Sequence, residues 1–205
     1  MIIERIPLFT HEVFHFQLSD FDSWKKKIEQ IILVEENKNI HGQSTVPDDQ
    51  CNVVGKRTAW NSHIRYPILD SLCKEIKNHI SEFIKNEGYD IPRLDVENCW
   101  INWYKKNEYA QPHKHGNYLS VVLFVDIEDT DGKFFFHDDC NLVFIKKEDV
   151  ASNFSNLKEV KAKNGTVIFF DGSLHHSVSA NTTDKTRVTM AVNFYVNYEI
   201  KLNEH

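Results

Sequence analysis

Two stretches in the first half of the chain repeat apolar residues every three or four positions, the spacing of a helix with one buried face. In residues 19–36, Ser19 and Asp22 form a capping box ahead of a stripe made by Phe21, Trp24, Ile28 and Ile31 or Ile32. In residues 67–88, a proline begins and a glycine ends a stripe made by Leu69, Leu72, Cys73, Ile76, Ile80 and Phe83 or Ile84. The pattern predicts two helices, separated by a long irregular connection at residues 37–65.

From Leu94 the pattern changes to short runs of β-branched and aromatic residues separated by Asp-Gly and Asn-Gly turns. We predict strands at residues 96–104, 119–126, 133–137, 142–145, 166–170 and 186–198. Paired antiparallel, such strands suit a double-sheet jelly roll. The expected fold is therefore α+β, mainly β: a double-stranded β-helix with N-terminal supporting helices.

A chain of 205 residues is long enough for one domain with a substantial core, and we expect residues 1–205 to form a single domain. Residues 1–93 would be the helical support and its loops, and residues 94–205 the β core. The formal charge of −6 disfavours duplex nucleic acid as a partner. Four scattered cysteines and the lack of a secretory signal predict a cytoplasmic protein with reduced thiols. No apolar run approaches the roughly 20 residues that span a bilayer, so no membrane partner is expected.

Candidate chemistry begins with two histidines, His113 and His115, in a loop just before the predicted strand 119–126. On an extended segment, residues two apart point to the same side, so both imidazoles can reach one metal ion. His176 follows another apolar strand and is a third candidate. The adjacent His175 must point the opposite way on an extended backbone, so we exclude it as a ligand of the same ion.

The predicted last strand has one polar and one apolar face. Arg187, Thr189, Ala191 and Asn193 alternate with apolar residues, so they share one side of the strand. An arginine facing the inside of a barrel is costly unless it meets an anion, and its planar fork matches a carboxylate. Pairing with a nearby aspartate or glutamate is the alternative.

These residues carry a resemblance that covers roughly residues 100–194. The motifs are Trp100-Ile101-Asn102, His113-Lys114-His115, His176-Ser177-Val178 and the later Arg187. They resemble the 2-oxoglutarate/Fe(II)-dependent dioxygenases, whose fold is a double-stranded β-helix, and most closely a group of short, often phage-encoded oxygenases. The resemblance implies Fe(II) as cofactor and 2-oxoglutarate and O₂ as co-substrates, with hydroxylation of a C–H bond and release of succinate and CO₂.

The resemblance also implies roles for individual residues. His113 would be the first iron ligand, His176 the distal ligand, and Arg187 the clamp on the far carboxylate of 2-oxoglutarate. Thr189 would assist Arg187, and Tyr104 and Asn102 would lie beside the co-substrate.

One position departs from the superfamily pattern. Two residues after the first histidine the superfamily usually has a carboxylate, whereas this chain has His115. Three neutral imidazoles would leave the iron centre one unit more positive. We favour His115 as a ligand; the alternative is that Asp138 or Asp139 supplies an oxygen from another strand.

Other readings stay open from the sequence. A cupin-like metalloenzyme shares the barrel, but the glutamate of the cupin motif is missing from residues 116–121. A non-catalytic β-sandwich binding module and a hydrolytic zinc enzyme are the remaining alternatives. The substrate, whether a protein side chain, a nucleobase or a small molecule, is not determined, and neither is the oligomeric state. We expect residues 37–65 and 146–163 to form the recognition surface.

Overall fold

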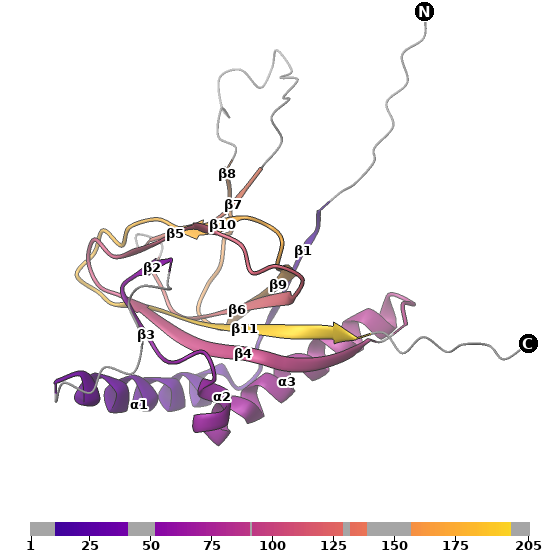
Figure 1. Ribbon diagram of the computed structural model, residues 1–205, viewed down its shortest axis with the longest axis horizontal. Coiled ribbons are helices and arrows are strands. Elements are labelled where there is room, and N and C mark those ends of the chain that lie inside the picture. The colour runs from indigo at the N-terminus through magenta and orange to yellow at the C-terminus, as the bar shows by residue number, and fades with distance from the viewer. Residues whose placement is uncertain (1–10, 41–51, 91, 129–131, 139–156, 198–205) are drawn as a thin grey trace, which may run out of the picture.

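The structure is a computed structural model that describes residues 11–40, 52–90, 92–128, 132–138 and 157–197. Two antiparallel sheets face each other, and two long helices cover the outer face of one of them (Figure 1). This is the expected arrangement of a β core with N-terminal supporting helices, and the predicted fold class is confirmed.

The helical support has the two predicted helices and one short addition. α1 spans Phe21–Ile40 and α3 spans Pro67–Asn86, so both begin within two residues of the predicted start. α3 buries its predicted stripe at Leu69, Leu72, Cys73, Ile76 and Ile80. Gly88 follows α3 with a φ of 81°, a left-handed conformation that glycine adopts without steric cost. The addition is α2, a single turn at Ser62–Arg65.

The larger sheet lies against the helices and has the strand order β1-β9-β6-β11-β4-β3. Its strands are β1 (Val13–Gln17), β3 (Lys56–Arg57), β4 (Arg93–Tyr104), β6 (Leu119–Asp126), β9 (Thr166–Asp171) and β11 (Arg187–Asn197). Four of them were predicted with small differences at the ends. β1 was missed because its five residues pair only with β9, more than 140 positions away in the chain.

The smaller sheet has the order β2-β5-β10-β7-β8. Its strands are β2 (Val53–Val54), β5 (Tyr109–His113), β7 (Phe134–His137), β8 (Leu157–Glu159) and β10 (His176–Val178). Only β7 was predicted. The predicted strand at residues 142–145 lies outside the described residues.

Two expectations about loops need correction. Residues 52–65 are not irregular, because β2 pairs with β5, β3 pairs with β4, and α2 follows. His113 does not lie in a loop but ends β5. Both errors have one cause: these strands are too short to show periodicity, and their hydrogen bonds go to strands distant in the sequence.

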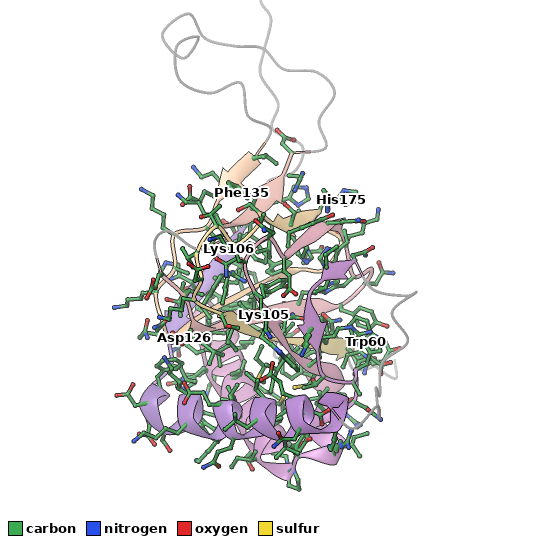
Figure 2. All side chains as sticks on the ribbon, turned by 90° about the vertical axis from the view of Figure 1, so that its left-hand side faces the viewer. Trp60, Lys105, Lys106, Asp126, Phe135 and His175 are labelled. Atoms are coloured by element: carbon green, nitrogen blue, oxygen red, sulfur yellow. The ribbon has the colours of Figure 1, made fainter. Side chains whose placement is uncertain are left out.

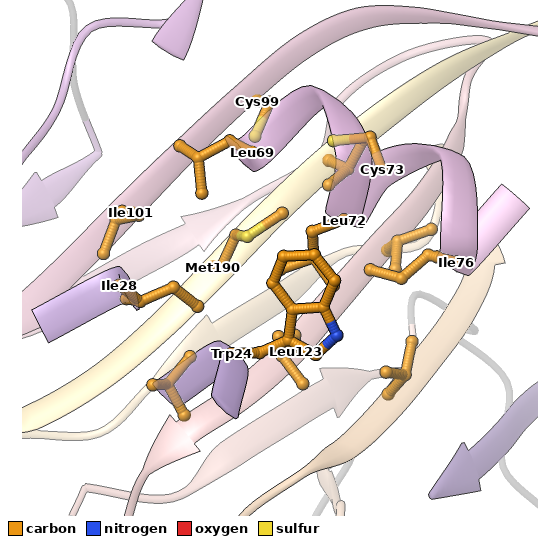
Figure 3. Close-up of a cluster of buried hydrophobic side chains, with 14 of the residues drawn as sticks. Trp24, Ile28, Leu69, Leu72, Cys73, Ile76, Cys99, Ile101, Leu123 and Met190 are labelled. Carbon is orange, nitrogen blue, oxygen red and sulfur yellow. The ribbon is translucent and has the colours of Figure 1, made fainter. Parts of the chain in front are cut away.

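The larger sheet separates two cores. Between this sheet and the helices, Trp24, Ile28, Leu72 and Ile76 pack against Ile101, Leu123 and Met190 (Figure 3). Between the two sheets lies an aromatic core with Tyr104, Phe124, Phe134, Phe136 and Phe170. Among the described residues, no helix is long and apolar enough to cross a membrane.

Candidate metal centre and cavity

Three histidines from two paired strands and the following loop come together between the sheets. His113 ends β5 and lies directly opposite His176, the first residue of β10, in the antiparallel register. His115 follows two residues later, where its backbone N–H donates to the carbonyl of Gly172 at 2.7 Å. Each histidine offers a ring nitrogen within 4.8 Å of the other two. In the part of the chain that the structure describes, no aspartate or glutamate joins this group.

The Nδ1 atom of each imidazole is bonded to a carbonyl oxygen. His113 Nδ1 bonds to the main-chain oxygen of Gln111 at 2.6 Å, and His176 Nδ1 bonds to that of Leu174 at 2.9 Å. His115 Nδ1 bonds instead to the side-chain oxygen of Asn193 at 2.9 Å. A carbonyl oxygen can only accept, so Nδ1 carries the proton in all three rings and Nε2 keeps its lone pair.

Burial keeps these imidazoles neutral. His176 is 3% exposed and stacks on Phe134, with ring centroids 5.4 Å apart. Burial lowers the pKa of His176 to about 3 and the pKa of His115 to about 4, helped by the neighbouring histidines. Burial also lowers the pKa of His113. At neutral pH all three rings are therefore uncharged and able to bind a cation.

A cavity of about 170 Å³ opens beside the histidines. Asn102, Tyr104 and Thr189, three of the predicted co-substrate residues, line it together with Trp60, Trp100 and Phe134. The Asn102 side-chain oxygen is buried and has no hydrogen-bond partner among the described residues. A buried polar atom in that state favours a ligand or water in the cavity.

Arg187 lies next to this cavity rather than in its wall. It is 1% exposed, and its guanidinium lies 5.5 Å from the ring centre of Tyr104 and 5.7 Å from that of Phe124. It lines a neighbouring cavity of about 300 Å³ with Lys133 and Lys161, and Phe134 borders both spaces. The four predicted co-substrate residues form two facing pairs on β11 and β4, Arg187 with Tyr104 and Thr189 with Asn102.

The other candidate residues lie elsewhere. Asp138 is exposed and outside the histidine group, and Asp139 lies outside the described residues. His175 also stands outside the histidine group. Trp60 is 40% exposed and lies at the edge of the molecule between the helices and the smaller sheet (Figure 2).

Sequence reasoning missed the partners of His115. Alternation along β11 put Asn193 on the face of Arg187, but nothing in the sequence linked it to His115. Ser120 was not singled out at all, although its hydroxyl lies 3.0 Å from His115 Nδ1. These contacts depend on the pairing of β11 with β6, which is a property of the tertiary structure.

Residues 98–193 match the family model described as "Putative 2OG-Fe(II) oxygenase". This region holds the three histidines, Arg187 and most of the residues that line the cavity. The β core is that of a 2-oxoglutarate/Fe(II) oxygenase. The resemblance seen in the motifs is thus confirmed, and with it Fe(II) and 2-oxoglutarate as the cofactor and co-substrate of the oxygenase.

Solved structures share the fold of the oxygenase at low sequence identity. The α-ketoglutarate-dependent epimerase SnoN of nogalamycin biosynthesis has a TM-score of 0.62 at 13% identity, over 90% of this chain and 76% of its own. HygX from Streptomyces hygroscopicus, with nickel, 2-oxoglutarate and hygromycin B bound, has a TM-score of 0.60 at 13% identity, over 90% and 83%. The viral collagen prolyl hydroxylase of Paramecium bursaria Chlorella virus-1 has a TM-score of 0.54 at 14% identity, over 91% and 96%. No curated protein matches the chain.

Proposed function

We propose that the oxygenase hydroxylates a C–H bond of its substrate at an iron held by His113, His115 and His176. The observation that carries this proposal is the orientation of the three rings, each with Nδ1 on a carbonyl oxygen and Nε2 left for the ion. Imidazole is a good ligand for Fe(II), and three ligands leave positions for a co-substrate and O₂. Fe(II) held there would supply redox chemistry with O₂ as the oxidant: one oxygen atom would enter 2-oxoglutarate, which is oxidised to succinate and CO₂, and the other would enter the C–H bond of the substrate.

We assign the co-substrate to the two facing pairs on β4 and β11. Asn102, Thr189 and Tyr104 line the cavity beside the histidines. The Arg187 guanidinium lies 5.5 Å from the centre of the Tyr104 ring, outside the cavity wall. The unpaired side-chain oxygen of Asn102 can only accept a hydrogen bond, so it suits a donor group or water beside the co-substrate, and Arg187 supplies the positive charge for the far carboxylate. The residues of the chain would thus orient the co-substrate and exclude water around it.

The segment that carries β2 and Trp60 is our candidate for substrate recognition. Asn52, Val53 and Trp60 line the same cavity as the histidines and come from the connection predicted to recognise the substrate. The class of substrate stays open. A single domain and a cytoplasmic location also stay predictions; the free, buried thiols of Cys73 and Cys99 agree with a reducing compartment.

The test is an anaerobic titration of Fe(II) and 2-oxoglutarate that follows the weak visible charge-transfer band of the ternary complex. We expect a band that requires both additions and a loss of 2-oxoglutarate affinity of about tenfold or more in Arg187→Ala. Lys133→Ala is the matched control, since it removes a positive charge from the neighbouring cavity. The control should titrate like the native protein.

Three outcomes would contradict the proposal. Tight metal binding without a band would favour a cupin-like or zinc enzyme, and no metal binding would favour a non-catalytic binding module. A loss in Lys133→Ala equal to that in Arg187→Ala would mean that overall charge, not the arginine, attracts the co-substrate.

A further inference from the structure

The three histidines of the centre are not held in the same way. His113 and His176 each bond to a main-chain carbonyl two residues earlier, an acceptor that any side chain at that position would leave in place. His115 bonds to a side chain, that of Asn193. The orientation of one proposed ligand therefore depends on a residue that mutation can remove.

We propose that Asn193 is the positioning residue that makes His115 a metal ligand, and that Ser120 orients Asn193. The inference rests on the three-histidine centre proposed above. Asn193 and Ser120 face each other across β11 and β6, and both are buried, with 4% and 1% of their surface exposed. Neither side chain is free to turn towards solvent.

The contacts around His115 close a triangle. The Ser120 hydroxyl donates to the Asn193 side-chain oxygen at 2.9 Å, and the same oxygen lies 2.9 Å from His115 Nδ1. The amide presents its oxygen rather than its NH₂ group to both the hydroxyl and the ring. His115 must then donate from Nδ1, and Nε2 is left unprotonated for the ion.

The backbone around the triangle is built for close approach. The loop of His115 is clamped to Gly172 by two hydrogen bonds, from His115 N to Gly172 O at 2.7 Å and from Gly172 N to Tyr118 O at 2.8 Å. A β-carbon at Gly172 would lie 2.8 Å from the Ser120 hydroxyl, closer than real β-carbons approach. The pairing of β11 with β4 also shifts register directly after Asn193. Such irregularities commonly re-aim side chains beside active sites.

Two substitutions of Asn193 distinguish a positioning role from simple packing. Asn193 is neutral, so it orients His115 without adding the negative charge that a carboxylate ligand would bring. Asn193→Asp keeps an acceptor of the same shape, whereas Asn193→Leu keeps the volume and removes the acceptor. If Asn193 positions His115, the aspartate should preserve metal binding and the leucine should not.

The experiment measures Co(II) affinity and its visible spectrum in the full chain, together with the His115 tautomer by ¹⁵N–¹H NMR of the metal-free protein. We expect Asn193→Leu to weaken Co(II) binding about 10- to 100-fold and to lower the Nδ1–H population of His115. Asn193→Asp should bind Co(II) within a few-fold of the native affinity. Ser120→Ala should lie between the two.

Asn98→Leu is the matched control, because Asn98 faces Asn193 from β4 but, among the described residues, makes no hydrogen bond to His115. An equal loss in Asn98→Leu, or native affinity and tautomer in Asn193→Leu, would overturn the inference. If Asn193→Leu does not fold, Ser120→Ala with native affinity and tautomer would overturn it equally. Native protein that binds no Co(II) would instead contradict the proposed centre, so the two failures are distinguishable.

Discussion

The two faces of the larger sheet differ in how many polar side chains they bury. The face towards α1 and α3 buries aliphatic and aromatic side chains such as Ile101, Met190 and Val192. The face towards the smaller sheet buries Asn102, Arg187, Thr189 and Asn193 beside its aromatic residues. Buried polar groups cost free energy unless they meet partners. The difference shows that burial on the helix side stabilises the fold, whereas the buried polar groups of the inner side reduce the free energy of unfolding and form a site.

The largest effect should come from removing a histidine on the inner side. His176→Gln should reduce iron binding and succinate formation to background, because glutamine lacks the imidazole nitrogen that binds the ion. The matched control is His175→Gln, one position along, which should retain bound iron. Iron content after anaerobic loading and succinate yield are the measurements. Stoichiometric, tight iron in His176→Gln would refute the assignment.

The helix side should respond in stability and not in chemistry. Ile76 is fully buried against the sheet, and Ile76→Ala should cost about 2–5 kcal/mol of unfolding free energy. Urea denaturation measures the loss, and iron affinity of the folded fraction should not change. Leu33, 61% exposed on α1, provides the control: Leu33→Ala should change stability by less than about 0.5 kcal/mol. If Ile76→Ala lowered iron affinity as much as His176→Gln does, the two faces of the sheet would not act independently.

Acid should act on the inner side of the metal-free protein. Burial holds the pKa of His176 at about 3 and that of His115 at about 4, below the value near 6.5 of an unfolded chain. The unfolded state therefore binds more protons below pH 6.5, and stability present above this pH is lost as the pH falls. Between pH 7.5 and 4.5 the loss should be about 2–3 kcal/mol for each ring.

Denaturation with a chelator present at both pH values tests this expectation. In His176→Gln the fall between pH 7.5 and 4.5 should be smaller by the contribution of one ring. An identical fall in the native protein and in His176→Gln would mean that other groups cause the acid sensitivity.

The smallest effect should come from an exposed ion pair on the outer surface of α3. Lys74 Nζ lies 2.6 Å from Asp70 Oδ2, but the two side chains are 68% and 37% exposed. Solvent screens such pairs, so Lys74→Ala should change the unfolding free energy by less than about 0.5 kcal/mol. Urea denaturation of the variant beside Ile76→Ala gives the comparison. A loss above 1 kcal/mol would show that α3 depends on more than its buried stripe.

Much of the fold could be predicted from local pattern. α1, α3, β4, β6, β9 and β11 are long enough to show a repeat of apolar residues, and each has a side that is buried whatever its neighbours are. The polar face of β11 followed from alternation alone. Six of the described strands were missed, each two to five residues long, and they exist because other strands complete their hydrogen bonds: β1, β2, β3, β5, β8 and β10.

The candidate site divides in the same way. His113, His115 and His176 could be selected from spacing and motif, and the structure brings their rings together. Their roles as ligands, and those of Arg187, Tyr104, Asn102 and Thr189, stay predictions for the experiments above. The exposed position of Asp138 favours His115 over that aspartate as the third ligand.

The sequence by itself determined the secondary structure of the long elements, the class of the β core and the identity of the candidate metal ligands, because these depend on neighbours within one strand or helix. Only the tertiary structure decided which tautomer His115 adopts. That choice depends on Asn193 and Ser120, more than 70 residues apart in the chain and joined by the pairing of β11 with β6. A hydrogen bond of this kind requires a register that no local pattern encodes.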